Sequence, residues 1–182
     1  MLCDLHQVHG ADVVLATPEW PQRPPADGIV AIRPGLTLLV RAADCVPVLL
    51  VAPEQGVVGA AHSGRPGLVA GVVPATVARM REFGAGLIEG WIGPHVCGRC
   101  YEVPEQMRAD VAAVVPDSFS ETSWGTPSLD LGAGVRAQLE QLEVVVHDAS
   151  RCTRESADLY SYRRDGERAG RLAGVVRLRA SA

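Results

Sequence analysis

Eight short apolar segments, each bounded by Gly or Pro, constrain the fold of this 182-residue chain more than any other feature. Short segments that are rich in β-branched residues and closed by turn formers are typical of β-strands. The segments are residues 12–16, 28–32, 36–42, 46–52, 57–61, 87–92, 144–148 and 173–178. The PEQG sequence at 53–56 predicts a hairpin loop between two of them. Residues 46–52 have the character of a buried strand, the kind on which a core is built.

Three longer segments between these strands place apolar residues at helical spacing. Residues 68–83 form the first, and Pro74 is expected to kink it or to mark a restart. Residues 104–115 form the second. Residues 131–142 form the third, with Asp130 as a candidate N-cap. Because strands and helices do not alternate regularly, we expect an α+β fold, a mixed-sheet sandwich with flanking helices, rather than a doubly wound fold.

Length and composition favour a single domain spanning residues 1–182. Hydrophobic residues make up 47% of the chain, yet no stretch is long and apolar enough to span a membrane. The formal charge of −4 provides no basic surface for nucleic acid. The first ten residues lack the pattern of a signal peptide, so a cytoplasmic location is expected. Residues 17–27 and 116–128 are expected to be irregular connections.

Five cysteines form an odd set, which favours a reduced setting over a disulfide scaffold. They are Cys3, Cys45, Cys97, Cys100 and Cys152. The CGRC sequence at 97–100 is a lone C-x-x-C, and a structural zinc site would need a second pair of ligands. Because the sequence shows no second pair, two ordinary loop cysteines are expected in preference to a redox pair.

Cys45 stands at the head of an apolar strand, close to Arg41 and Asp44. A buried structural thiol would be ordinary at this position, but the charged pair beside it indicates a chemical role for the thiol. His9 and His62 each lie within two residues of a glycine, at the end of an apolar segment. If the three side chains converge, one thiolate and two imidazoles form the ligand set of a catalytic zinc site with an open fourth position. A buried thiol and two hydrogen-bonded histidines are the alternative.

Six separated motifs occur in the order typical of one protein family. They are QVHG at 7–10, ADG at 26–28, RAADCVPVLL at 41–50, AAHSG with a later Gly at 60–67, IGP with CYEV at 92–103, and CT, YSYRRDG and GR at 152–171. On these motifs the chain resembles the YfiH-like family, also known as laccase-domain or multicopper polyphenol oxidase proteins. The resemblance implies the YfiH-like cysteine hydrolase fold, shared with certain bacterial toxin deamidases. It also implies a zinc ion held by His9, Cys45 and His62.

The activity that this resemblance implies is zinc-dependent purine nucleoside phosphorolysis, in which these three residues form the catalytic centre. Phosphate would attack the anomeric carbon of adenosine, inosine or methylthioadenosine and release the base and ribose 1-phosphate. Water attacking the purine would instead deaminate adenosine. Arg41 is the leading candidate to bind phosphate, followed by Arg163 and Arg164. Asp44 is expected either to orient a ligand or to pair with Arg41.

Two alternatives stay open beside the phosphorylase. In a metal-free hydrolase or deamidase, Cys45 would be the nucleophile and His62 its base. In a catalytically inactive, shortened family member, two departures from the family pattern would matter. HSGRPG at 62–67 stands where the family usually reads HAGWRG, which places Arg65 and Pro66 at the variant positions. Family members also usually carry a longer segment before QVHG, so the domain is expected to lack that N-terminal segment and to expose a sheet edge.

Multicopper chemistry is disfavoured by the histidine content. Two His and one Cys suit a blue-copper site, but a multicopper oxidase also needs a trinuclear cluster with many further imidazoles. Only His6, His95 and His147 remain, and they are scattered along the chain.

Overall fold

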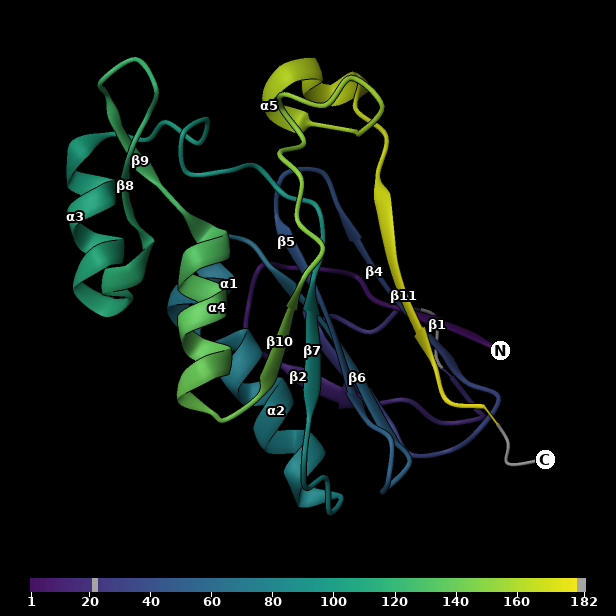
Figure 1. Cartoon of the computed structure of the whole chain (residues 1–182). Helices are drawn as coiled ribbons and strands as arrows, with labels where there is room; N and C mark the ends of the chain where they lie inside the picture. Colours follow the sequence, from purple (N-terminus) through teal and green to yellow (C-terminus); the bar gives the residue numbers. More distant parts are fainter. Residues whose placement is uncertain (21–22, 180–182) are drawn as a thin grey trace.

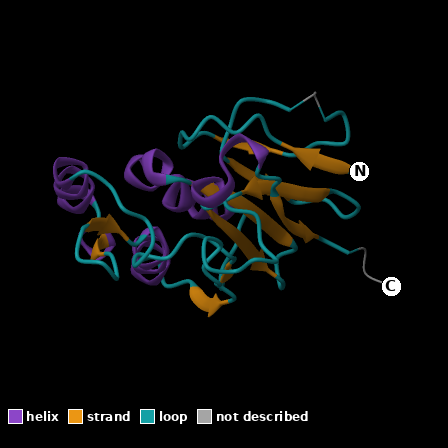
Figure 2. Ribbon diagram, turned by 90° about the horizontal axis from the view of Figure 1, so that it is seen from above, coloured by secondary structure: helices purple, strands orange, loops and turns teal. Residues whose placement is uncertain are grey.

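A six-stranded sheet packs on one face against a three-stranded sheet and on the other face against helices (Figures 1 and 2). The computed structural model describes residues 1–20 and 23–179. The larger sheet has the order β10-β7-β5-β6-β3-β2, the smaller one β1-β4-β11, and β8 pairs with β9 in a separate ribbon. Parallel and antiparallel pairs are mixed in both larger sheets. This arrangement confirms the predicted α+β sandwich with flanking helices.

The elements are short, as the sequence indicated. The strands are β1 (Leu2–Asp4), β2 (Val13–Leu15), β3 (Gly28–Ala31), β4 (Thr37–Ala42), β5 (Val46–Ala52), β6 (Val57–Ser63), β7 (Glu89–Ile92), β8 (Phe119–Glu121), β9 (Pro127–Leu129), β10 (Val145–Asp148) and β11 (Leu172–Arg177). The helices are α1 (Arg65–Ala70), α2 (Val72–Glu82), α3 (Glu105–Val114), α4 (Leu131–Gln141) and α5 (Tyr162–Asp165), with 3₁₀ turns at Pro116–Ser118 and Gly166–Arg168. Among the described residues, no helix combines the length and apolar character that crossing a membrane requires.

All eight predicted strands are present, and three further strands were not predicted. β1 adds a parallel edge to β4, whereas β8 and β9 pair within the segment 116–128 that was expected to be irregular. Each of these strands has three residues, which is too short for an alternating pattern to be recognised. Residues 21–22 of the predicted 17–27 connection lie outside the described residues.

The predicted helix 68–83 is two helices, α1 and α2, and the break is at Gly71 rather than at Pro74. Gly71 takes the left-handed conformation with φ 80°, which a residue without a Cβ adopts without strain. Pro74 lies in the first turn of α2, where its missing N–H has no helical partner to lose. The predicted cap of α4 is confirmed, because the Asp130 side chain accepts a hydrogen bond of 2.8 Å from the Ala133 N–H.

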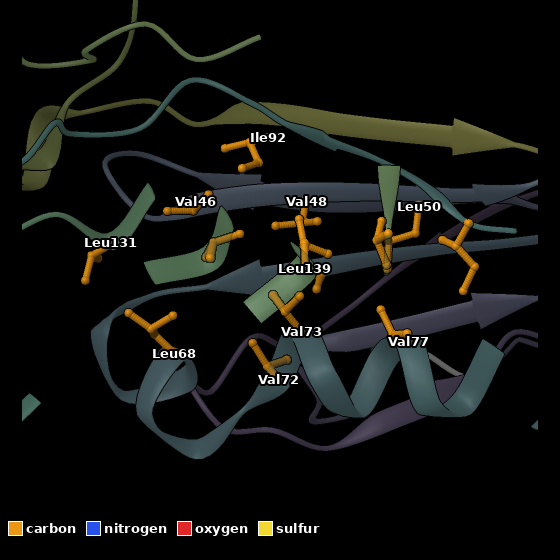
Figure 3. Packing of buried hydrophobic residues seen from close by; sticks show 14 of the residues in the cluster. Val46, Val48, Leu50, Leu68, Val72, Val73, Val77, Ile92, Leu131 and Leu139 are labelled. Atoms are coloured by element: carbon orange, nitrogen blue, oxygen red, sulfur yellow. The ribbon is translucent and has the colours of Figure 1, made fainter. Parts of the chain in front are cut away.

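The larger sheet is buried on both faces, and its strand β6 has no exposed residue. On the helix side, Val46, Val48 and Leu50 of β5 point toward side chains of α1, α2 and α4 (Figure 3). On the other side, Leu49 and Val51 pack into a second core shared with β4 and β11. Two cores on opposite faces therefore fix β5 and β6 rigidly in the middle of the molecule.

The chain passes from the smaller sheet to the larger one between Ala42, where β4 ends, and Val46, where β5 begins. Asp44 has φ 89° in this crossover, a left-handed conformation that is uncommon for a residue with a side chain. In the antiparallel pair β5–β6, Val46 lies opposite Ser63 and Pro47 lies opposite His62. The crossover thus places Cys45 beside the end of β6.

Replacing Leu50 by Ala tests the importance of the helix-side core. The Leu50 side chain is fully buried, so Leu50→Ala is expected to lower the free energy of unfolding by about 3 kcal/mol, measured by urea denaturation. Leu87→Ala is the matched control, because Leu87 is 59% exposed and its truncation should change the free energy by less than about 0.5 kcal/mol. Equal effects of the two substitutions would contradict this description of the core.

Candidate active site

His9, Cys45 and His62 come together at one end of the two sheets, although they are far apart in the sequence. His9 lies in the loop between β1 and β2, Cys45 in the crossover before β5, and His62 near the end of β6. Their ligand atoms all lie within 4.8 Å of one another, and Cys45 Sγ is 3.8 Å from His9 Nε2. In a tetrahedral zinc site the corresponding atoms are separated by roughly 3.3–3.6 Å, as follows from the bond lengths. The cluster needs only a slight contraction to hold such an ion.

The buried carboxylate of Asp27 organises two of these three residues. Its Oδ1 lies 2.8 Å from Nδ1 of His62, and its Oδ2 accepts hydrogen bonds from the N–H groups of Gly10 (2.7 Å) and Val8 (3.1 Å). The first contact leaves Nε2 of His62 for the cluster, and the other two fix the turn that carries His9. Sequence reasoning missed this role, although Asp27 belongs to the quoted ADG motif.

The protonation of the cluster follows from these contacts. Burial alone would lower the pKa of His62, but its hydrogen bonds with Asp27 and Cys45 raise that pKa to about 9. Burial alone would raise the pKa of Cys45, but hydrogen bonds with His62 and His9 lower it to about 7. Near neutral pH the metal-free cluster therefore has a protonated His62 beside a Cys45 thiol that is ionised in a substantial fraction of the molecules. A bound metal ion would displace the proton of His62.

Gly64 leaves room for the cluster. A Cβ atom at this position would lie 2.6 Å from Cδ2 of His9 and 3.0 Å from Sγ of Cys45. His9 itself has φ 61°, so its left-handed backbone depends on the hydrogen bonds of the neighbouring residues to Asp27. A glycine is thus needed at position 64 of the AAHSG motif, because any larger residue would collide with His9 and Cys45.

The variant positions of the HSGRPG sequence lie away from the cavity described next. Arg65 begins α1, and Pro66 is its second residue, a position at which proline is well tolerated. Neither residue lines the cavity. Within the described chain, the change from the usual family sequence therefore alters a helix start rather than the cavity wall.

A cavity of about 850 Å³ opens beside the cluster, large enough for a nucleoside with phosphate. It is lined by His6, Gln7, His9, Arg23, Arg41, Ala42, Ala43, Asp44, Cys45, His62, Tyr101, Leu131, Tyr162, Arg163, Ala169 and Arg171. The lining combines aromatic rings, cationic groups and the three candidate ligands, which is the composition expected of a site for a polar, partly aromatic molecule.

Two of the arginines that line the cavity are paired with one carboxylate. Arg41 lies 3.3 Å and Arg23 3.2 Å from Asp4, and both also donate to the Leu5 carbonyl. The predicted alternative of an Asp44–Arg41 pair is wrong. Asp44 instead accepts hydrogen bonds of 2.6 Å from the Thr153 hydroxyl and from the backbone N–H of Arg163, so it fastens the C-terminal segment to the crossover.

Arg163 and Arg171 are the cavity arginines without a carboxylate partner among the described residues. Arg163 donates to the Glu102 carbonyl and stacks on the Tyr101 ring, whereas Arg171 donates to the carbonyls of Ala169 and Gly170. Their positive charges are thus available to an anion. The GR sequence that contains Arg171 was part of the quoted motif, but its role was not predicted.

Arg164, which was predicted as a weaker phosphate ligand, is structural. Its guanidinium donates to the carbonyls of Thr153, Ser156 and Leu159 and pairs with Asp165. These contacts hold the loop before α5 in shape. Arg164 does not line the cavity.

The other histidines do not build a larger metal cluster with His9 and His62. His6 lines the cavity, but His95 lies 2.9 Å from the Gly93 carbonyl, and His147 pairs with Glu89 and stacks on Trp91. In the part of the chain that the structure describes, the groups with metal-ligand spacing contain no third imidazole. This agrees with the argument against multicopper chemistry.

Comparisons with known proteins agree with the fold and the motifs. The chain is 59% identical over 179 residues to a purine nucleoside phosphorylase of Streptomyces coelicolor, covering 94% of this chain and 73% of the relative. It is 56% identical to a purine nucleoside phosphorylase of Streptomyces griseus, covering 94% and 72%. Among solved structures, YlmD from Geobacillus stearothermophilus is 32% identical with a TM-score of 0.86, covering 98% of this chain and 74% of that chain.

A second solved structure gives the same result. A Neisseria meningitidis protein of the DUF152 family is 30% identical with a TM-score of 0.87, covering 98% of this chain and 75% of that chain. Residues 1–179 match the family described as multi-copper polyphenol oxidoreductase laccase. The fold, the ordered motifs and these matches together show that the chain belongs to this laccase-like family, which is the YfiH-like family.

Proposed function

We propose that this chain is a zinc-dependent purine nucleoside phosphorylase, in which His9, Cys45 and His62 hold the zinc ion. The observation that carries the proposal is the convergence of one thiolate and two imidazoles beside a cavity with two unpaired arginines. The names of the relatives from Streptomyces support the same activity. We further propose a cytoplasmic setting, which agrees with the five free thiols.

The ligand set suits a catalytic zinc ion, and it lacks the further imidazoles that a multicopper centre would need among the described residues. Two imidazoles and one thiolate leave a fourth tetrahedral position that faces the cavity. When bound, zinc would supply a Lewis acid that orients and polarises an oxygen nucleophile. Asp27 would keep the His62 ring in the orientation that this binding requires.

The residues of the cavity suggest how phosphorolysis would proceed. Arg163 and Arg171 would bind phosphate, and Tyr162 would stack on the purine from the cavity wall. A phosphate oxygen would form a bond with the anomeric carbon of the ribose while the bond from that carbon to the purine nitrogen breaks. The purine nitrogen takes up the electron pair and, overall, the proton that the attacking phosphate loses, and ribose 1-phosphate is the second product. Adenosine, inosine and methylthioadenosine share this reacting bond.

The same cluster supports a second, hydrolytic activity and one alternative mechanism. Water attacking the amino-bearing carbon of the purine would form a carbon–oxygen bond there while the bond to the amino nitrogen breaks, so that adenosine and water give inosine and ammonia. In a metal-free protein, the Cys45 thiolate would instead be the nucleophile and His62 its base. The Asp27 carboxylate would orient the His62 ring. This second candidate is favoured by the lowered pKa of the thiol. A catalytically inactive family member would show neither chemistry.

Phosphate-dependent release of adenine from adenosine is the direct test of the proposed function. Arg171→Ala is expected to raise the KM for phosphate about tenfold or more, because a charge-assisted hydrogen bond is lost, with little change in the KM for adenosine. Cys45→Ala should abolish both zinc binding and turnover. Arg177→Ala is the matched control, because Arg177 is exposed on the same strand region but does not line the cavity. Adenine release that needs no phosphate, or that survives Cys45→Ala, would contradict the proposal.

Alkylation of the metal-free protein by iodoacetamide tests the state of the thiol. The thiolate fraction of Cys45 grows as pH rises through about 7, so its alkylation rate should reach half its maximum near pH 7. Burial and the neighbouring Cys152 raise the pKa of Cys97, so its peptide should react only at clearly higher pH. Mass spectrometry of the peptides measures both rates in one sample. If zinc protects Cys45, the ligand role is supported. Rapid alkylation in zinc-saturated protein would instead favour the cysteine hydrolase.

A further inference from the structure

A second cluster of potential ligands lies apart from His9 and His62. It consists of Cys97, Cys100, Cys152 and Glu155, whose ligand atoms all lie within 4.8 Å of one another. The sequence led to the expectation of two ordinary loop cysteines at 97 and 100, and it did not reveal the two further ligand groups beside them. The second pair of ligands comes from a segment more than fifty positions later, so the spacing within the sequence did not reveal it.

The CGRC sequence forms a tight turn that presents both of its thiols on one side. The N–H of Cys100 donates to the Cys97 carbonyl at 2.9 Å, and the N–H of Tyr101 donates to the same oxygen at 3.0 Å. A Cβ atom on Gly98 would lie 2.6 Å from the Ser120 hydroxyl and 2.8 Å from a side-chain atom of Asp130. The turn is thus packed tightly against α4 and β8, and its shape requires the glycine.

The backbone brings the other two ligands to this turn. His95 donates from its N–H to the Arg151 carbonyl and accepts from the N–H of Thr153, which pairs Cys152 with the strand segment before the turn. The N–H of Ser156 donates to the Cys152 carbonyl, and the resulting turn directs Glu155 back toward the sulfurs. The Cys100 thiol lies 3.4 Å from a carboxylate oxygen of Glu155.

Three sulfurs and a carboxylate at these distances match the donor set of a structural zinc site. Such sites are four-coordinate, use mainly thiolates and leave no position open. In tetrahedral zinc sites the sulfurs are roughly 3.8 Å apart, and the ligand atoms here all lie within 4.8 Å of one another. Four groups that become anionic repel one another, and a divalent cation removes that repulsion. We propose that Cys97, Cys100, Cys152 and Glu155 bind a second zinc ion, which has a structural role.

This second site would hold two segments of the cavity wall together. The residue after Cys152 is Thr153, whose hydroxyl donates to the Asp44 carboxylate at 2.6 Å. The residue before Cys97 is Val96, whose N–H donates to the Asp44 carbonyl at 3.0 Å. Asp44 directly precedes Cys45. A zinc ion at the second cluster would therefore hold in place both segments that hydrogen-bond to Asp44, the residue before Cys45.

The proposed zinc ion would also help to position α5. The segment that runs from Cys152 to α5 lies over the ends of β4 and β5 (Figure 1) and supplies Tyr162 and Arg163 to the cavity. Arg154 ties this segment to the turn by donating to the Cys100 carbonyl at 3.0 Å. In the described part of this loop, hydrogen bonds and the proposed ion replace the apolar core that a short segment cannot build.

Metal analysis of the 182-residue chain and three variants tests the second site. Wild-type protein purified with zinc is expected to hold about two ions per chain, whereas Cys100→Ser and Cys45→Ala should each hold about one. Cys3→Ala is the matched control, because Cys3 is a buried thiol outside both clusters and its loss should leave about two ions. The two losses are independent, so failure of the zinc site at Cys45 and failure of the second site are told apart. Equal zinc content in wild type and Cys100→Ser overturns the second site.

Cobalt substitution of variants whose fold has been checked by circular dichroism tests the second site with a signal that comes from the thiolates themselves. In Cys45→Ala loaded with Co²⁺, thiolate-to-cobalt absorption should persist, because three sulfurs remain in the second cluster. Glu155→Gln changes an exposed side chain and should keep the fold, shift this absorption and speed the release of the ion to a chelator about tenfold. Absence of thiolate-to-cobalt absorption in Cys45→Ala overturns the proposal. So does a disulfide among Cys97, Cys100 and Cys152 in protein kept under reducing conditions.

Discussion

The hydrogen bonds of the buried Asp27 carboxylate are the interaction on which the site depends. A buried carboxylate is stable only where its charge is paired and its oxygens are hydrogen-bonded, and Asp27 meets this condition through His62 and the N–H groups of Val8 and Gly10. The Asp27 carboxylate thereby joins the loop after β1 to the end of strand β6. Asp27 holds the His62 ring directly and positions His9 through the backbone of its two neighbours.

The crossover between the two sheets provides the third member of the cluster. Cys45 has to lie where β4 ends in one sheet and β5 begins in the other, and the two cores on either side of β5 fix that point. Asp44 holds the crossover in a left-handed conformation through contacts with Val96, Thr153 and Arg163. The candidate active site and the thiol cluster around Cys97 are thus linked through the adjacent residues Asp44 and Cys45. A zinc ion proposed at the second cluster would thus support the candidate site without touching a substrate.

The sequence predicted the local features of this protein better than the long-range ones. Alternation and turn residues identified eight strands, and the Asp130 cap was recognised because both signals depend on neighbours in the chain. The grouping of β4 and β5 into different sheets depends on packing between distant segments, which no local pattern encodes. For the same reason the role of Asp27 and the approach of Cys152 to the CGRC turn were missed. The family motifs brought His9, Cys45 and His62 to notice, but only coordinates show the carboxylate behind them.

The most direct test of whether this carboxylate organises the site is the zinc affinity of the Asp27→Asn variant. Competition with a chromogenic chelator measures this affinity. An amide cannot supply the charge that orients His62 and anchors the turn of His9. The affinity of the site at Cys45 is therefore expected to fall about 10- to 100-fold. Asp110→Asn on the exposed face of α3 is the control and should bind zinc like the wild type. An unchanged zinc affinity in folded Asp27→Asn protein would contradict the account.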